Sequence, residues 1–333
     1  MGAGHAKSLA PTPRRSSSLF VTADLSYQQG LVVGVQRWVS GGSVRGVSPT
    51  RVAVVGTLNM DVLDVVVTVD GQPGAEEMVL GSVVRERCGG KGANQAIAAA
   101  SVGDGTSVAL IGTVGRDIAG ALMLANAKSF GVDVTYVGID GDTSGRTLVE
   151  VDASGDKRIV FVPGANSLLS CTSVVTALEA LDPAVVLTQL ESSRAVAESV
   201  ADWCAARGRR FVLNPSPVIP LPERVLALAD PLVVNEYEAR AYADTDSDFA
   251  TALLQLSASA VITMGARGVT VATGDRTSSI AVTPVPEGVE TTGAGDYFAG
   301  VLAARIASGA DLHDAAAHAA DSATAFIADR HFG

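Results

Sequence analysis

Val52-Ala53-Val54-Val55-Gly56 is a short apolar run that ends in glycine, which is typical of a strand buried on both faces of a parallel sheet. An Ala-rich stretch typical of a helix, residues 195–207, is one of several that separate such runs. Similar strand-like runs recur at residues 107–111, 185–187, 211–213, 232–234 and 260–263. Strands that alternate with helices predict an α/β fold with a doubly wound, mostly parallel sheet flanked by helices.

Two segments, 62–87 and 146–162, break this alternation. Both are rich in Val and Thr, alternate in polarity and lack helical periodicity. We expect antiparallel strands that form a small sheet beside the main domain. This sheet would serve either as a lid over a binding site or as a set of extra edge strands.

Residues 1–50 differ in composition from the rest of the chain. They contain five Lys or Arg residues, one acidic residue and a Ser cluster at 16–18. Such a segment is either an organelle transit peptide, or a disordered extension or translated sequence upstream of the true start. We expect residues 1–50 to be a disordered extension and residues 51–333 to form a single ordered domain.

The composition excludes several classes of protein. The 333 residues are 47% hydrophobic, which is enough for one continuous core, and their formal net charge is −11. An acidic chain argues against non-specific binding to nucleic acid, which needs a basic surface. Three cysteines far apart in the sequence predict reduced thiols in a cytoplasmic protein. No uninterrupted apolar run reaches the roughly 18 residues of a membrane span.

The most informative motif is Glu290-Thr291-Thr292-Gly293-Ala294-Gly295-Asp296, which opens an amphipathic helix. Apolar residues continue at helical spacing from Phe298, and Gly309 occupies a C-cap position. The two glycines allow the backbone to approach a ligand, and the free N–H groups of the first turn would form an anion site. Asp296 is then either an N-cap or a general base, and the spacing alone leaves both open.

A second motif, Cys88-Gly89-Gly90-Lys91-Gly92-Ala93-Asn94-Gln95-Ala96, places three glycines around a lysine. It lacks the spacing of a P-loop. It would let the backbone and the Lys91 ammonium approach one small polar ligand, with Asn94 and Gln95 at the start of an Ala-rich helix. The alternative is a flexible turn with a solvated lysine.

A third motif, Gly56-Thr57-Leu58-Asn59-Met60-Asp61, follows the first predicted strand. Ligands of open α/β sheets collect at the carboxyl ends of the strands. Asn59 and Asp61 are therefore candidates for binding ligand hydroxyl groups, and an ordinary turn is the alternative.

Together these motifs resemble the ribokinase-like, or phosphofructokinase-B, family of carbohydrate kinases. The match runs from about Val52 to Arg330, and its signatures are residues 89–96 and 292–296. The first signature, with residues 59–61, resembles the ribose-specific members. The resemblance implies ATP-dependent phosphorylation of D-ribose at its 5-hydroxyl. Alternatives are a kinase for another small sugar or a nucleoside, and a catalytically weak ligand-binding homologue. A dehydrogenase is disfavoured because no GxGxxG follows the first strand.

The resemblance also implies a role for each matched residue. The catalytic base would be Asp296, and the anion hole would be formed by Gly293, Ala294 and Gly295. Sugar binding would fall to Asn59, Met60, Asp61, Gly90, Lys91, Gly92, Ala93, Asn94, Glu191 and Asp296. Nucleotide binding would fall to Asn235, Thr263, Met264, Gly265, Ala266, Arg267, Gly268, Gly295 and Asp296. Magnesium would be placed indirectly by Glu238, and a potassium ion would be bound by Glu290 and Thr292.

Two features depart from the family pattern. Ribokinases usually have Asp at the position of Glu290, so this potassium site keeps its charge but gains a methylene. The family also continues beyond the position of Gly333 with a segment that closes the nucleotide and cation sites. We therefore expect either a truncated sequence or weaker binding of ATP and potassium. The helix that contains His318 and Asp321 should border the adenine, and the resemblance implies a homodimer formed through the lid.

Overall fold

The computed structural model describes residues 52–67, 85–152, 157–243, 245, 248–274, 276–286 and 289–332. All of these residues belong to one compact unit, Val44–Gly333. The expectations for residues 1–50, and for residues 68–84 and 153–156 of the small sheet, lie outside the described residues. Within the described residues, no helix is both long and apolar enough to cross a lipid bilayer.

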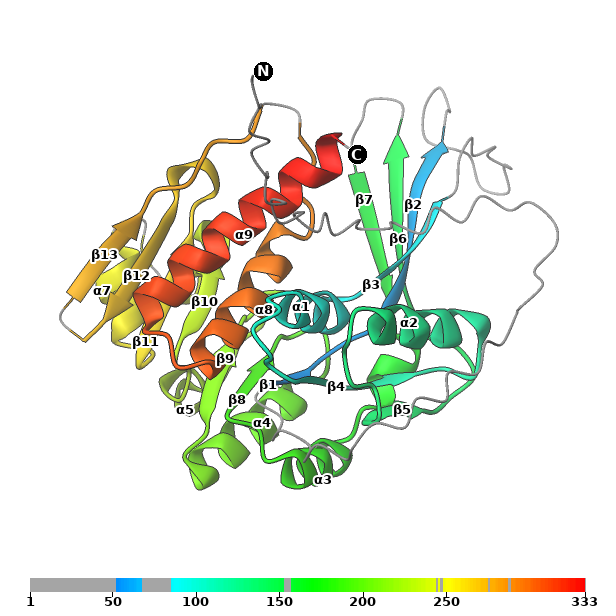
Figure 1. The fold of residues 1–333 in the computed structure, drawn as a ribbon. Helices are drawn as coiled ribbons and strands as arrows, with labels where there is room; N and C mark the ends of the chain where they lie inside the picture. Colours follow the sequence, from blue (N-terminus) through cyan, green and yellow to red (C-terminus); the bar gives the residue numbers. More distant parts are fainter. Residues whose placement is uncertain are drawn as a thin grey trace, which may run out of the picture. The chain divides into compact units, whose positions relative to one another are not determined.

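The main sheet follows the predicted pattern of short, buried, mostly parallel strands (Figure 1). All pairings are parallel from β11 across to β5, whereas β12 and β13 add an antiparallel edge. The strands of the described chain lie in the spatial order β13 (Arg276–Ile280), β12 (Val269–Thr273), β11 (Ser259–Thr263), β10 (Leu232–Asn235), β9 (Arg210–Leu213), β8 (Val185–Thr188), β1 (Val52–Val55), β4 (Val108–Val114) and β5 (Val137–Ile139).

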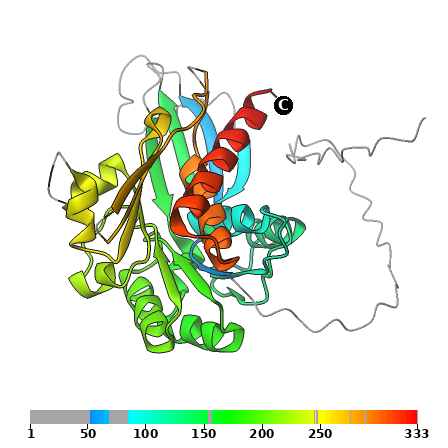
Figure 2. The same cartoon turned by 60° about the vertical axis from the view of Figure 1, so that its left-hand side comes forward.

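Helices cover both faces of this sheet, which confirms the doubly wound architecture (Figures 1 and 2). Alternate residues of β1 point to opposite faces, so the strand is buried on both sides. Val52 and Val54 pack under α1 (Lys91–Ala100), α2 (Ile118–Ser129), α8 (Ala294–Ala307) and α9 (Leu312–Phe332). Ala53 and Val55 pack under α3 (Cys171–Leu181), α4 (Arg194–Arg207), α5 (Glu223–Ala227), α6 (Glu236–Ala243) and α7 (Phe249–Leu254).

Helices α1 and α8 cross at very short range because Gly300 has no side chain. A Cβ added to Gly300 would overlap the carbonyl oxygen of Gln95 and would lie 2.8 Å from the Cβ of Ala98. Small residues at a helix crossing allow the two backbones to approach closely. This crossing brings the start of α1 beside the start of α8, where the two glycine-rich motifs lie.

The second sheet is separate from the first and contains, among the described residues, β3 (Arg85–Gly89), β2 (Asn59–Val67), β6 (Gly145–Asp152) and β7 (Lys157–Val162) in that order. The prediction of a small independent sheet is therefore confirmed, and the alternative of extra edge strands is wrong. The outer pairs are antiparallel as expected, but β2 and β6 run parallel. Both strands leave the main domain in the same direction, β2 after β1 and β6 after β5, and this common direction makes them parallel.

Candidate active site

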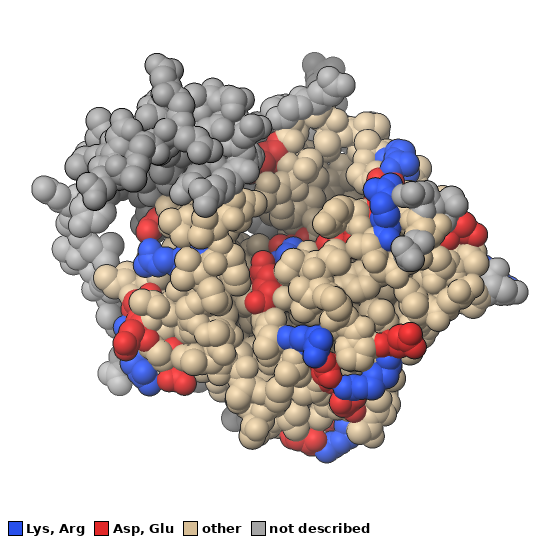
Figure 3. Space-filling model, turned by 180° about the vertical axis from the view of Figure 1, so that it is seen from behind, with Lys and Arg blue, Asp and Glu red and all other residues tan. Residues whose placement is uncertain are grey.

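The predicted site residues converge at the carboxyl ends of the central parallel strands. The chain continues from β1 to β4 on one side and later adds β8 on the other side, so β1 is the point where the strand order reverses. Open α/β sheets bind their ligands in the crevice at such a point. On the face drawn in Figure 3, acidic and basic side chains lie around a hollow, whereas most of the surface is uncharged.

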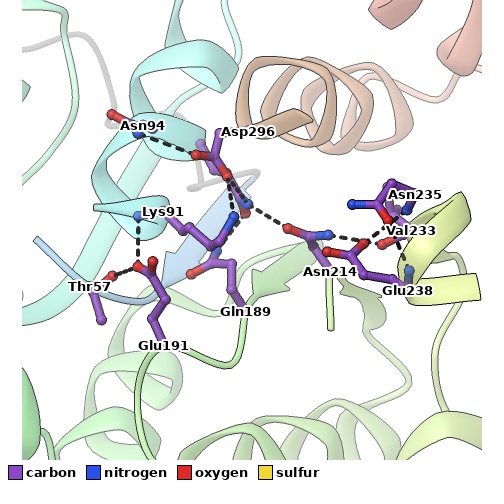
Figure 4. A network of polar contacts seen from close by, with 11 residues as sticks. Thr57, Lys91, Asn94, Gln189, Glu191, Asn214, Val233, Asn235, Glu238 and Asp296 are labelled. Carbon is purple, nitrogen blue, oxygen red and sulfur yellow. Dashed lines mark hydrogen bonds and ion pairs between the residues drawn. The ribbon is translucent and has the colours of Figure 1, made fainter. Parts of the chain in front are cut away.

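Asp296 is in the first turn of α8 and is 8% exposed. Gly293 is the N-cap residue, with a φ of 87°, and the Asp296 carboxylate does not cap the helix. It accepts hydrogen bonds from Gln95 Nε2, at 3.0 Å from Oδ1, and from Asn94 Nδ2, at 3.3 Å from Oδ2 (Figure 4). The Lys91 ammonium lies 3.6 Å from Oδ1. The N-cap alternative is therefore wrong, because the carboxylate points to α1.

The second motif is an ordered helix start rather than a flexible turn. Helix α1 begins at Lys91, and Gly90 has a φ of 89°. A Cβ at Gly90 would lie 2.7 Å from the Asn59 nitrogen, and one at Gly92 would lie 2.5 Å from the Gly56 carbonyl carbon. Both glycines thus allow the motif to pack directly on the connection between β1 and β2.

Two residues predicted to bind the sugar have side chains in the core. Met60 and Ala93 are buried in the cluster under α1, α2, α8 and α9. The Ala93 N–H donates to the Thr57 carbonyl at 3.0 Å, and Met60 is paired with both β3 and β6 in the small sheet.

Glu191, in the loop after β8, is hydrogen-bonded to the second motif through Lys91 and to the third motif through Thr57. Its carboxylate accepts a hydrogen bond from the Lys91 backbone N–H at 3.0 Å and another from the Thr57 hydroxyl. Burial lowers the pKa of Lys91, but Asp296, Glu191 and Glu238 raise it by more, so the net shift is upward. Lys91 therefore remains a cation at neutral pH, with carboxylates on several sides.

Asn59 is positioned by a residue that the sequence did not reveal. Asn166, in the short 3-10 helix η1 (Gly164–Leu168), accepts from the Leu58 N–H and donates to the Leu58 carbonyl, both at 3.1 Å. Its amide also donates to Asn59 Oδ1 at 2.8 Å. Asn166 is buried and fixes the connection from β1 to β2 together with the Asn59 side chain.

Asp61 lies on β2, and its Oδ2 is 3.9 Å from Arg87 Nη2 on β3. Burial raises the pKa of Asp61 to about 6, although Arg87 and a hydrogen bond from Thr147 act in the opposite direction. The negative charges of Glu191 and Asp296 add to the upward shift. Asp61 therefore changes between its neutral and its ionised form near pH 6.

Asn235 and Glu238 form a capping box at the start of α6. The Asn235 side chain accepts from the Glu238 N–H, and the Glu238 carboxylate accepts from the Asn235 N–H, both at 2.9 Å. These reciprocal bonds satisfy free N–H groups at the helix start. Glu238 is buried, so its charge acts on the site from behind this cap.

The predicted nucleotide loop follows β11 and contains the 3-10 turn η2 (Gly265–Arg267). Gly265, Ala266 and Arg267 are exposed, whereas Gly268 is buried, and Arg267 pairs with Glu236 of α6. Helix α9 packs on α8, β12 and β13, with His318 and Asp321 exposed.

Glu290 and Thr292, the predicted potassium residues, are both exposed. In the part of the chain that the structure describes, no group of three or more His, Cys, Asp or Glu side chains could hold a metal ion. A Cβ added to Gly295 would have no heavy atom within 4 Å. The backbone of the glycine-rich loop is therefore accessible to a ligand at this residue.

Buried amides lie at the centre of the site, and two of them, Gln189 and Asn214, were not among the residues predicted from the sequence. Gln95, Gln189 and Asn214 are buried and hydrogen-bonded to one another. Gln189 and Asn214 directly follow the buried strands β8 and β9. Polar residues at those positions were the signal that could have revealed them.

Comparisons with known proteins agree with this geometry. A family model described as pfkB family carbohydrate kinase matches residues 49–331. The ribokinase of Bacillus subtilis is 36% identical over 80% of this chain and 88% of its own length. The deoxyribokinase of Salmonella typhi is 28% identical over 79% of this chain and 88% of its own length. The crystal structure of a Thermotoga maritima ribokinase matches with a TM-score of 0.70 and 26% identity, over 81% of this chain and 90% of that one. The chain therefore belongs to the pfkB family of carbohydrate kinases.

Proposed function

We propose that this kinase transfers the γ-phosphoryl group of ATP to the 5-hydroxyl of D-ribose, giving ribose 5-phosphate and ADP. One observation carries the proposal: Asp296 lies between the motif proposed to bind the sugar and the loop proposed to bind the phosphoryl group. It contacts Asn94 and Lys91 of the sugar-side motif, and it belongs to the helix that starts at the accessible loop 293–295. The 36% identity to a ribokinase supports ribose as the acceptor.

In this proposal Asp296 accepts the proton of the 5-hydroxyl while that oxygen attacks the γ-phosphorus. The bond from phosphorus to the oxygen of the leaving ADP breaks, and the N–H groups of Gly293 and Gly295 would stabilise the phosphoryl oxygens. The Ala294 N–H, which donates to the Thr291 carbonyl at 3.1 Å, would join them only on leaving that carbonyl. Phosphoryl transfer depends mainly on such positioning and charge stabilisation. The Lys91 ammonium lies 3.6 Å from Oδ1 of the Asp296 carboxylate.

The remaining sugar contacts would come from Asn59, Asp61 and Glu191, whose polar atoms lie around Lys91 or on the adjoining lid strand. Carboxylates and amides suit a sugar because each hydroxyl both donates and accepts a hydrogen bond. Gly90, Gly92 and Asn94, which flank Lys91 in the same motif, would add backbone and side-chain groups.

The nucleotide would lie along the exposed loop 265–267, with Asn235, Thr263, Met264 and Gly268 beside it. Magnesium suits this side because it keeps several waters and binds chiefly through substrate phosphates. When bound, it would neutralise phosphate charge. Glu238 would act on it only indirectly, since its carboxylate is engaged in the capping box.

We extend the proposal to potassium, held by Glu290 and the Thr292 carbonyl beneath the glycine-rich loop. A fixed cation there would order the loop N–H groups. The test compares kcat in sodium and potassium salts at equal ionic strength. A higher kcat in potassium than in sodium supports the site. It is refuted if wild type and Glu290→Gln each have the same kcat in both salts.

We also propose that the enzyme acts in the cytoplasm as a homodimer joined through the lid. Cys88, Cys171 and Cys204 are free thiols, as a reducing compartment would favour. Ile159 and Phe161 project from β7 and are exposed. Size-exclusion chromatography with light scattering should give a dimer for wild type and a monomer for Phe161→Glu, and a monomeric wild type refutes the dimer.

The test of the main proposal is an ADP-release assay with ribose, 2-deoxyribose, fructose and adenosine. We expect the highest kcat/KM for ribose. The likeness to a deoxyribokinase makes 2-deoxyribose the informative competitor. A higher kcat/KM for any other acceptor would refute ribose, and sugar binding without turnover would indicate a ligand-binding homologue.

A further inference from the structure

A chain of buried amide side chains connects Asp296 to the main sheet (Figure 4). Asn214 Nδ2 donates to the Val233 carbonyl at 3.0 Å, and Gln95 Nε2 donates to Asn214 Oδ1 at 3.1 Å. The same Gln95 nitrogen donates to Asp296 Oδ1 at 3.0 Å. Gln189 Nε2 donates to Gln95 Oε1 at 2.5 Å, so every polar atom of the Gln95 amide is engaged.

The orientation of the Gln95 amide is set from two sides. A backbone carbonyl only accepts hydrogen bonds, so Asn214 must turn its NH2 group to Val233 and its oxygen to Gln95. Gln95 must then present its NH2 group to Asn214, and this is also the group that faces Asp296. The chain ends at Gln189 Oε1, which is buried and has no hydrogen-bond partner among the described residues. This unsatisfied oxygen is the cost of the arrangement.

The consequence falls on the two oxygens of Asp296. Oδ1 faces both the Gln95 NH2 group and, at 3.6 Å, the Lys91 ammonium. Within the described part of the chain, Oδ2 accepts a single, longer hydrogen bond, from Asn94 at 3.3 Å. Because the Gln95 NH2 group can donate but cannot accept, it favours a carboxylate without a proton on Oδ1.

We infer that Gln95 is a positioning residue that holds Oδ1 of Asp296 and leaves Oδ2 as the oxygen that takes the proton from the substrate hydroxyl. This inference rests on the proposed role of Asp296 as the base. Gln95 itself contacts no substrate in this scheme, and Asn214 acts one step further away by fixing the orientation of Gln95.

The test replaces Gln95 by Met, which has a similar length but no donor. A hydrogen bond to a charged group is worth about tenfold or more, so the acid limb of the kcat–pH profile should move up by about one pH unit. KM for the sugar should change less than about threefold, because Gln95 is not among its contacts. Ser257→Ala is the matched control, since it removes another buried hydrogen-bonding group far along the chain, beside Leu253 and Ser259. An unmoved acid limb would overturn the inference.

Asn214→Leu is a second variant, at a residue that does not contact Asp296. It tests the positioning role of Gln95 if Gln95→Met fails to fold. It frees Gln95 to rotate, so the acid limb should move in the same direction by a smaller amount. An unmoved limb in this variant also overturns the inference.

A measurement without turnover separates this inference from the proposed function. In protein labelled with 13C at the Asp carboxyls, the Asp296 resonance is identified by its absence from Asp296→Asn. Its titration should move to higher pH in Gln95→Met. If wild type phosphorylates no acceptor, the proposed function fails and this titration still tests the positioning. If the titration is the same in wild type and variant, the positioning role is refuted.

Discussion

Replacing Asp296 by Asn changes the reacting group while leaving its surroundings nearly unchanged. The amide oxygen can still accept from Gln95 Nε2, which lies 3.0 Å from Oδ1, and it stays near the Lys91 ammonium. The amide nitrogen would face Asn94, whose own amide must turn over to offer its oxygen. One hydrogen bond is exchanged for another, but Lys91 loses its nearest negative charge, so we expect the free energy of unfolding to fall by about 1–2 kcal/mol.

The effect on catalysis should be much larger. A positioned base contributes about 10²- to 10⁴-fold. At 1.36 kcal/mol per decade, this raises the barrier by about 2.7 to 5.4 kcal/mol. Because the loss is in proton acceptance and not in sugar contacts, kcat should fall by this factor while the Kd of the sugar changes less than about threefold.

The assay combines ADP release for kcat with calorimetric titration of the sugar and a thermal melt. Asp202→Asn is the matched control, because it removes an exposed carboxylate from α4, where Asp202 pairs with Arg224. A variant that melts like wild type and retains more than about a tenth of its kcat would refute Asp296 as the base.

Further predictions concern Asp61, Gly295 and Gly300. Burial raises the pKa of Asp61 to about 6, so KM for the sugar should rise about tenfold per pH unit below 6 as the carboxylate protonates, and a similar rise in Asp61→Asn would contradict this cause. The same shift should lower the free energy of unfolding as the pH rises from about 4 to 6, because Asp61 keeps its proton in the folded chain and releases it in the unfolded chain. Gly295→Ala should melt like wild type, since its Cβ meets no protein atom, yet kcat/KM for ATP should fall at least about tenfold, and unimpaired ATP use would show that the phosphoryl group lies elsewhere. Gly300→Val should lower Tm by several degrees, because overpacking costs about 1–3 kcal/mol, and an unchanged melt would mean that α1 and α8 separate freely.

Much of the fold could be read from local composition. Residues 52–55 are buried on both faces, and their unbroken apolar character predicted this. The parallel pairing of β2 with β6 was not predictable, because alternating polarity describes a strand and not the direction of its neighbour. That direction depends on where each strand leaves the main sheet.

The site was predictable where its residues lie in compact motifs. Residues 89–96 and 292–296 were identified from their glycine spacing, and the structure brings Lys91, Asn94 and Asp296 together. The amides of Gln189 and Asn214 were missed because they become neighbours only when β8 and β9 pair beside α1. The Asn-x-x-Glu spacing at 235–238 carried a second meaning, since it also matches a capping box, and the structure forms one.

The small sheet and part of the proposed sugar site belong to the same peptide segments. Strand β2 begins at Asn59, β3 ends at Gly89 just before Lys91, and β6 begins at Gly145 against the amides of Asn59 and Asn166. A chimera that received this sheet from a relative would therefore also receive that relative's residues at positions 59–61, while Lys91, Glu191 and Asp296 would stay with the main domain. On the proposed assignment, its choice of sugar would shift only in part with the sheet, while its use of ATP would stay with β10, β11 and α8. Acceptor preference would thus be divided between the two sheets.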